Sequence, residues 1–428
     1  MDLTFFNEQI KKYERRIRAI EASPSSAFLK TNVELYRMEL ENLDRTLEAW
    51  KSGRPFAIMP GMEIFARIMG FYPWNYIAAG DRVTDPSRYL DAAIKAGYSD
   101  HSCDRTLTAL GLLLRGEMPP PRLVVSMRFA CEPERLTTVA AAKHSDALYY
   151  AIDNPLGWTY EALKYVTEQL WEIIGLAEKT IPGIQYDEDL LLEILHWTDE
   201  SKKLVRQNYE MRKNVPCPIG PKDAFRLDYV RGSKRGVEHY ERRLAEITER
   251  AEKGVGAIKE ERLRVAWMAT GPYSRDTFKI LEEMGVSVPW FHYGGAASMY
   301  SVVPYGENEK RYGRKLKPME KVAALAHFSG WAQTADYWID PLITVCRELK
   351  IDAVVDFLQP GCVVTKGLKK IISTRVKNEL GIPVLDLEGR QFFNSPAAQA
   401  EMNRRLAEFL ELCIQNKEAG HPAALPEV

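Results

Sequence analysis

The feature that most constrains the fold is a short apolar run that passes through a turn into a helix. The stretch "IDAVVDFL" (351–358) is apolar apart from its aspartates, which is typical of a parallel strand covered on both faces. After Pro360 and Gly361, "VVTKGLKKIISTRVKNELG" places apolar side chains three and four positions apart, which predicts a helix. A strand followed by a helix is the building unit of parallel α/β folds.

Similar strand candidates recur between helical segments. They are "RPFAIMPG" (54–61), "PRLVVSMRF" (121–129), "ALYYAID" (147–153), "RLRVAWMATG" (262–271), "VSVPWFHYG" (286–294) and "IPVLDLEG" (382–389). Because strands alternate with helices in two separate groups, the sequence predicts an α/β protein with two parallel-sheet domains of the Rossmann or flavodoxin-like kind.

Helical and proline-rich segments suggest where the domains divide. We expect an N-terminal helical segment at 1–52 and a first α/β domain at 53–213, which ends in a long helical stretch. The joint "NVPCPIGPKD" opens a linker with a connecting helix at 214–260, and the second α/β domain covers 261–428.

Composition and charge exclude several classes of protein. Apolar residues make up 46% of the 428 residues and the net charge is −1, so no global field attracts nucleic acid or an anionic membrane. The first residues, "MDLTFFNEQIKKYERR", do not resemble a signal peptide, and no apolar run is long enough to span a membrane. We therefore expect a cytoplasmic protein whose six cysteines are thiols or metal ligands.

Common catalytic motifs are missing from the sequence. It contains no G-x-G-x-x-G after a strand, no P-loop, no G-x-S-x-G elbow and no H-E-x-x-H. Paired C-x-x-C motifs of zinc sites are absent as well. The chain is therefore not expected to hydrolyse ATP through a P-loop. With these motifs absent, the cysteines are the remaining candidates for catalytic or ligand-binding chemistry.

Three cysteines lie where a loop passes into a helix. Cys362 follows the strand quoted first, Cys131 follows the strand at 121–129, and Cys103 follows a polar turn. Parallel sheets bind ligands at the carboxyl ends of their strands, and a helix N-terminus favours a thiolate. If the two sheets face each other, all three thiols could converge in a cleft between the domains.

The remaining cysteines are weaker candidates. Cys346 and Cys413 lie on apolar helix faces and are expected to be inert core residues, whereas Cys217, between two prolines, stays open as a ligand. On spacing alone, three thiolates suit an iron–sulfur cluster with one iron not bound by cysteine, but buried core cysteines are the better explanation of the pattern.

Two stretches resemble a known family. "AGYSDHSCDRTLTALGLLLRGEMPPPRLVVSMRFAC" is similar to the first-domain signature of the 2-hydroxyacyl-CoA dehydratase and benzoyl-CoA reductase family. "RVAWMATGP", "DAVVDFLQPGCVVTKGLKKIISTRVKNELGIPVLDLEG" and "NRRLAEFLEL" resemble parts of its second domain, so the resemblance covers most of residues 50–415. It implies that Cys103, Cys131 and Cys362 hold a [4Fe-4S] cluster.

The resemblance also implies partners and a radical mechanism. A separate ATP-hydrolysing activator would deliver one low-potential electron to the cluster, and a paralogous second iron–sulfur subunit would complete a heterodimer. The substrate would be a CoA thioester that loses water after one-electron reduction. From the chain itself, Lys366, Lys369 and Lys370 are candidates for CoA phosphate contacts, although such lysines usually form a solvated helix face. The fourth cluster ligand would be water, a substrate oxygen or a side chain. Ser99, His101 and Ser102 are the nearest polar side chains in sequence, unless they only form the turn before the helix.

Departures from the family pattern leave the substrate open. Cys131 is followed by Glu132 and Pro133, and Arg390 stands in the loop "LEGRQFFNS" where many members carry an acidic residue. One alternative is reduction of an aromatic ring, as in benzoyl-CoA reductase, or a related ATP-dependent reductase whose larger double-cubane cluster would recruit Cys217. The other is a two-domain binding protein for a small molecule, with the cysteines in its core.

Overall fold

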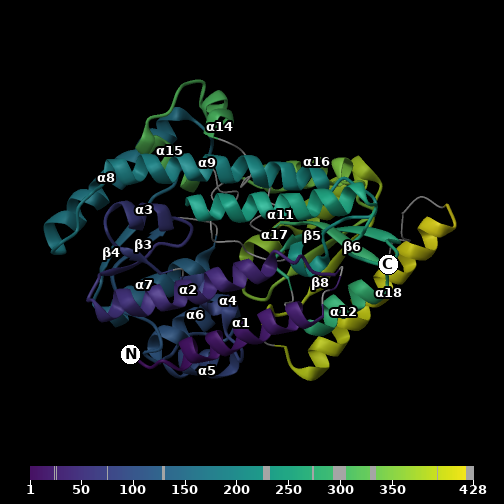
Figure 1. The fold of residues 1–428 in the computed structure, drawn as a ribbon, viewed down its shortest axis with the longest axis horizontal. Coiled ribbons are helices and arrows are strands. Elements are labelled where there is room, and N and C mark those ends of the chain that lie inside the picture. Colours follow the sequence, from purple (N-terminus) through teal and green to yellow (C-terminus); the bar gives the residue numbers. More distant parts are fainter. Residues whose placement is uncertain are drawn as a thin grey trace. The chain divides into compact units, whose positions relative to one another are not determined.

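The chain forms two compact units, which we describe from a computed structural model (Figure 1). Unit 1 contains residues 1–19, 33–199 and 304–334, and unit 2 contains residues 20–32, 200–303 and 335–428. The structure describes residues 1–420 apart from 24, 26, 75, 128–130, 225–231, 272–273, 293–304, 328–333 and 393.

Unit 1 is built around a four-stranded parallel sheet with the order β2-β1-β3-β4. Its strands are β1 (Phe56–Ile58), β2 (Tyr72–Pro73), β3 (Pro121–Met127) and β4 (Leu148–Ile152). Its helices are α1 (Thr4–Ala22), α2 (Asn32–Lys51), α3 (Glu63–Ile68), α4 (Tyr76–Arg82), α5 (Ser87–Lys95), α6 (Asp104–Leu114), α7 (Glu132–Ser145), α8 (Tyr160–Thr180), the first half of α9 (Glu188–Met211), α14 (Tyr305–Tyr312) and α15 (Pro318–His327).

Successive residues of the central strands belong alternately to two hydrophobic cores, one on each face of this sheet. Ala57 and Leu123 pack with residues of α3, α8, α9 and α15, whereas Phe56 and Val124 pack with residues of α1, α6 and α7. This alternation follows from the two-residue period of a strand. Both faces are covered, as the apolar strand runs predicted.

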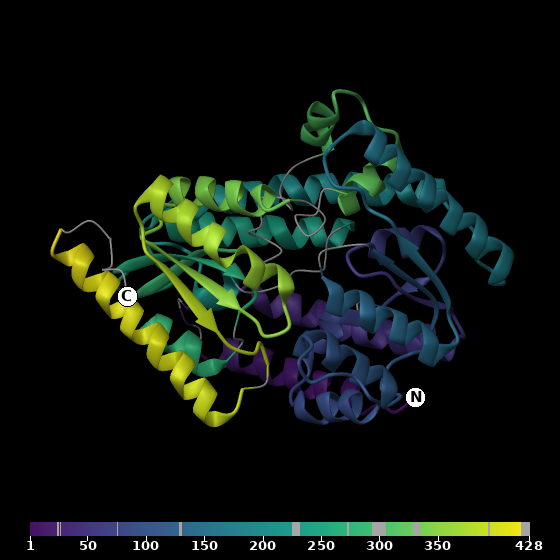
Figure 2. The same cartoon turned by 180° about the vertical axis from the view of Figure 1, so that it is seen from behind.

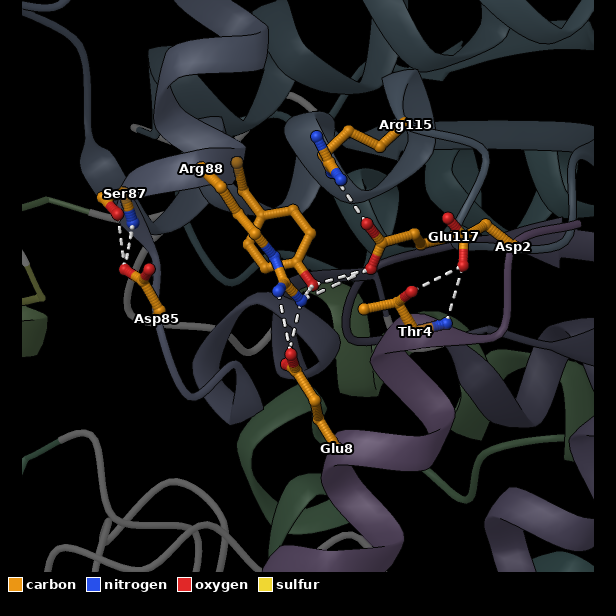
Figure 3. A network of polar contacts seen from close by, with 9 residues as sticks. Asp2, Thr4, Glu8, Asp85, Ser87, Arg88, Arg115 and Glu117 are labelled. Carbon is orange, nitrogen blue, oxygen red and sulfur yellow. Dashed lines mark hydrogen bonds and ion pairs between the residues drawn. The ribbon is translucent and has the colours of Figure 1, made fainter.

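A polar network holds α1 against the rest of unit 1 (Figure 3). Glu8 of α1 accepts two hydrogen bonds of 2.8 Å from the guanidinium of Arg88 on α5. Glu117, which is fully buried, accepts hydrogen bonds from the Tyr89 hydroxyl and from Arg115 Nε, both at 2.7 Å. Bidentate arginine–carboxylate pairs fix orientation as well as distance, so the first helix has a defined position in this unit.

Unit 2 repeats the same strand order. Its parallel sheet has the order β6-β5-β7-β8, with β5 (Leu263–Ala269), β6 (Val286–Phe291), β7 (Ala353–Leu358) and β8 (Val384–Glu388). Its helices are the second half of α9, α10 (Pro221–Ala224), α11 (Lys234–Glu252), α12 (Arg275–Glu283), α16 (Asp336–Glu348), α17 (Val363–Leu380) and α18 (Pro396–Glu418). In both sheets the first and third strands along the chain lie side by side. The position between these two strands is the switch point of the sheet, where such folds bind ligands.

Helices cover both faces of the second sheet. Val265, Val355 and Leu387 pack with residues of α12 and α18, and Figure 2 shows α18 in yellow beside this sheet. Helices α16 and α17 contact β5 and β7 respectively. A stripe of α18 that includes Met402, Leu406 and Cys413 belongs to this core, as its sequence pattern predicted.

The predicted fold class is confirmed: the chain is an α/β protein with two parallel sheets and N-terminal helices. Two details differ from the sequence reading. The strand β2 has only two residues and was missed, and the long helical stretch expected at the end of the 53–213 domain is divided into α8 and α9 at Pro182 and Gly183. Within the described part of the chain, no helix has the length and apolar character that spanning a bilayer would need.

Candidate functional site

Cys131 stands immediately before helix α7, four residues after β3 ends at Met127. It occupies the N-cap position of the helix with φ −86° and ψ 82°, and Pro133 stands in the first turn, where its missing N–H is not needed. The Cys131 carbonyl accepts the first helical hydrogen bond from Arg135, at 3.3 Å. The thiol is half-buried and therefore within reach of a ligand.

Cys362 has the equivalent place in unit 2, after the third strand of the sheet. Gly361 has φ 81°, a left-handed conformation that favours glycine, and lets the chain turn sharply between β7 and α17. The Cys362 N–H donates to the Gln359 carbonyl at 3.1 Å and closes this turn. Cys362 is the N-cap residue of α17 and is half-buried.

Cys103 is the N-cap residue of α6, a helix that packs against α7. Thr106 donates its hydroxyl to the Cys103 carbonyl at 3.0 Å, and Thr365 makes the same contact with Cys362 at 3.4 Å. The two helices therefore begin with the same C-x-x-T arrangement. Each of the three predicted ligands starts a helix, as the sequence indicated.

The predicted ligands are divided between the two units. Cys103 and Cys131 belong to unit 1, at the starts of two neighbouring helices, while Cys362 belongs to unit 2. That the three thiols share one cluster stays a prediction. Within the described residues, no three His, Cys, Asp or Glu side chains lie together in a way that could hold a metal ion.

The chemistry of the thiols fits an iron–sulfur cluster better at these three positions than elsewhere. Thiolates are the ligand form of cysteine, and a helix N-terminus stabilises their negative charge. The other three cysteines are buried, and burial raises the pKa of each thiol. For Cys346 and Cys413 the pKa rises to about 12. These three are therefore neutral thiols in their present surroundings.

Two interacting carboxyl groups of unit 1, one of them three residues after Cys131, were missed by the sequence analysis. Glu63 is the first residue of α3, after the switch-point strand β1, and Glu134 lies in the first turn of α7. Burial raises the pKa of Glu63, against backbone hydrogen bonds that lower it. Burial also raises the pKa of Glu134 to about 7, opposed by the charge of Arg105 and assisted by that of Glu63. Carboxyl groups with raised pKa values are suited to proton transfer at neutral pH.

Arg105 connects the starts of α6 and α7. It stands two residues after Cys103, and its charge acts on Glu134, three residues after Cys131. Its Nε and Nη2 atoms donate to the two carboxylate oxygens of Asp81, each at 2.5 Å. The guanidinium is thus fixed in place by a bidentate pair, and its charge favours the ionised form of Glu134.

The other predicted contacts lie in well-defined surroundings. Lys366 forms an ion pair of 2.6 Å with Glu388, and Lys369 one of 3.0 Å with Asp386, so these two lysines are joined to β8. Ser99 orders the turn before Cys103, because its hydroxyl accepts a hydrogen bond of 3.2 Å from the His101 N–H. The exposed His101 ring remains a candidate ligand by position alone.

These features define a class of two-unit α/β proteins that carry cysteines at the carboxyl ends of parallel strands. The chain belongs to the 2-hydroxyglutaryl-CoA dehydratase D-component family, whose model matches residues 63–413. It is 21% identical over 364 residues to the (R)-phenyllactyl-CoA dehydratase alpha subunit of Clostridium sporogenes, covering 81% of this chain and 86% of that protein. It is also 21% identical over 314 residues to the lactoyl-CoA dehydratase subunit alpha of Anaerotignum propionicum, covering 71% and 72%.

The predicted family is thereby confirmed. The chain is a distant relative of acyl-CoA dehydratase subunits. The two relatives are named as alpha subunits, which implies that those two proteins assemble with another kind of chain. The matched region begins at Glu63, the carboxyl group that follows β1, and extends to Cys413.

Proposed function

We propose that this chain is the alpha-type subunit of a 2-hydroxyacyl-CoA dehydratase and that Cys103, Cys131 and Cys362 hold a [4Fe-4S] cluster. The observation that carries the proposal is that each of these cysteines is half-buried at the start of a helix, whereas the other three are buried. In both units one of them follows the third strand of a sheet with the same order. Membership of the dehydratase family supports the reaction class.

The reaction removes a hydroxyl group from C2 and a proton from C3, and releases them as water. A bound [4Fe-4S] cluster would supply and recover one electron, which weakens the C2–oxygen bond and acidifies the C3 proton. In this proposal Glu63 and Glu134 take the proton from C3 and give one to the departing hydroxyl. Burial raises the pKa of both carboxyl groups, and that of Glu134, about 7, suits proton exchange at neutral pH.

The partners follow from the same proposal. The low-potential electron would come from a separate ATP-hydrolysing activator, because the sequence has no P-loop of its own. A paralogous second iron–sulfur subunit would complete the enzyme, which agrees with the alpha-subunit names of the relatives. The acyl group stays open, since the two relatives are named for different 2-hydroxyacyl thioesters.

Iron and acid-labile sulfide analysis of the anaerobically purified chain tests the cofactor. We expect about four irons per chain, while about eight would support a larger cluster and a reductase function. Buried Cys217, 1% exposed, is poorly suited to join a larger cluster. Absence of iron would favour the two-domain binding protein instead.

Replacement of each cysteine tests the ligand set. Cys103→Ala, Cys131→Ala and Cys362→Ala should each reduce bound iron severalfold, and the triple variant should bind none, because each change removes a thiolate ligand. The matched control is Cys413→Ala, which truncates a buried side chain of the α18 core and should lower only stability. Full iron content in the triple variant would refute the assignment.

A further inference from the structure

Polar atoms without hydrogen-bond partners collect at the carboxyl edge of the unit 2 sheet. Thr270 follows β5, His292 follows β6 and Gln391 lies in the loop after β8. The Thr270 hydroxyl, His292 Nδ1 and both the oxygen and the nitrogen of the Gln391 amide are shielded from solvent and make no hydrogen bond. Because the strands are parallel, the three residues lie at one edge of the sheet, where α/β folds bind ligands.

Gln391 is joined to the turn that presents Cys362. Its backbone N–H donates to the side-chain oxygen of Gln359 at 3.1 Å, and the Gln359 carbonyl accepts the Cys362 N–H at 3.1 Å. Gln391 is 2% exposed, and it lies next to Arg390, in the loop where the sequence departs from the family pattern. One residue, Gln359, therefore contacts both the cysteine turn and the loop that carries Gln391.

A shielded amide without hydrogen bonds destabilises a folded chain, and an apolar side chain of similar shape would cost less. Gln399, in the same unit, shows the ordinary alternative. Its amide nitrogen donates to Ser274 at 3.2 Å and to Asn403 at 2.9 Å, and its oxygen accepts from Asn394 at 3.2 Å. The unsatisfied amide of Gln391 is therefore the unusual one and calls for a ligand.

The chemistry of this edge selects the kind of group that would bind. The Gln391 amide offers a donor and an acceptor, and a hydroxyl group can satisfy both by accepting from Nε2 and donating to Oε1. His292 is uncharged at neutral pH, since burial lowers its pKa to about 4. The three side chains with unsatisfied atoms are uncharged, so a hydroxyl pairs with them at less cost than a carboxylate or phosphate.

We propose that the Gln391 side-chain amide binds the 2-hydroxyl group of the 2-hydroxyacyl-CoA substrate. This assignment rests on the proposed function, because a cluster at Cys362 would bring the reacting end of the substrate to the neighbouring loop. The amide is shielded in the ligand-free chain, so the loop after β8 must part from Gln359 when the substrate enters. Gln391 is then a specificity residue that distinguishes hydroxylated from non-hydroxylated thioesters.

Paired ligands and a paired substitution test the contact. Calorimetry on the full chain would compare lactoyl-CoA with propionyl-CoA and phenyllactyl-CoA with phenylpropionyl-CoA, since the members of each pair differ only in the hydroxyl. The native chain should prefer the hydroxylated thioester, and Gln391→Met should reduce that preference about five- to tenfold, as expected for one hydrogen bond. Binding of the propionyl and phenylpropionyl thioesters should change little.

Thermal unfolding without ligand separates a binding role from a structural one. Gln391→Met should leave the midpoint unchanged or raise it, because an unsatisfied amide is removed. The control Gln399→Met should lower it and keep the hydroxyl preference, because that amide is fully bonded. A lowered midpoint for Gln391→Met, or an unchanged hydroxyl preference, would overturn the assignment of Gln391 but would leave the proposed function standing. Failure of the native chain to bind any of the four thioesters would overturn the proposed function together with it.

Discussion

At the scale of single residues, the chain holds carboxyl groups whose burial changes their acid–base behaviour. Asp356 of β7 and Asp386 of β8 are paired in register, and Asp386 bonds Lys369 at 3.0 Å. Asp356 is fully buried and neither of its carboxyl oxygens has a hydrogen-bond partner. Burial, with the nearby charge of Asp386, raises the pKa of Asp356 to about 7, although Lys369 opposes the shift.

Asp356 should therefore make stability fall as the pH rises. The folded chain keeps this proton between the ordinary pKa of 3.8 and about 7, while the unfolded chain has released it, so unfolding becomes easier across that window and levels off above it. Asp356→Asn should remove this slope and gain about 2–4 kcal/mol near pH 8. Urea denaturation at several pH values measures both effects. A variant less stable than the native chain at alkaline pH would contradict the prediction.

Glu134 should contribute to turnover rather than to folding. Glu134→Gln keeps the shape of the side chain but can neither accept nor release a proton, so we expect kcat to fall by about 10²–10⁴ in the assembled enzyme. Iron content should be unchanged, because no ligand is removed. The matched control is Glu132→Gln, an exposed residue in the same first turn that should leave kcat unaltered. Equal kcat values for both variants would exclude Glu134 from the proton transfer.

At the scale of elements, the sequence identified the described strands except β2, and the helix starts at the cysteines, but not the carboxyl groups. Buried parallel strands are continuous apolar runs, and a helix after a turn leaves a 3.6-residue period, so both can be read locally. The cysteines were found because they stand at these junctions. Glu63 and Glu134 stand at similar junctions, but their raised pKa values depend on burial by other elements. Likewise, the unsatisfied Gln391 amide appears only in the folded chain.

The turn before α17 provides a test at this scale. Gly361 precedes the helix with φ 81°, and Gly381 ends it with φ 67°. A Cβ in this left-handed conformation costs about 1–2 kcal/mol, so Gly361→Ala and Gly381→Ala should destabilise the chain to a similar degree. Only Gly361→Ala should also weaken iron retention, because it distorts the turn that presents Cys362. If both variants lost iron equally in the presence of a chelator, iron retention would depend on the stability of α17 as a whole and not on the turn at Gly361.

At the scale of the whole molecule, unit 1 is not continuous in sequence. Residues 304–334 lie between segments of unit 2 but pack with unit 1. Met319 and Val322 of α15 belong to the core beneath α8, and Tyr160 of α8 donates its hydroxyl to Glu320 at 2.7 Å. The guanidinium of Arg311 lies 3.6 Å from the centre of the Trp158 ring, a cation–π contact. Unit 1 is therefore complete only after the chain has begun unit 2.

This discontinuity predicts how fragments will fold. A fragment of residues 1–199 lacks α14 and α15, which leaves the apolar surface of α8 that meets α15 exposed to water. We expect it to aggregate or to bind a hydrophobic dye without a cooperative thermal transition. A second fragment, in which a flexible glycine–serine linker joins residues 1–199 to 305–327, restores the buried face and should unfold cooperatively. Circular dichroism and dye binding compare the two. Cooperative unfolding of both fragments at the same temperature would show that unit 1 does not depend on the returning segment.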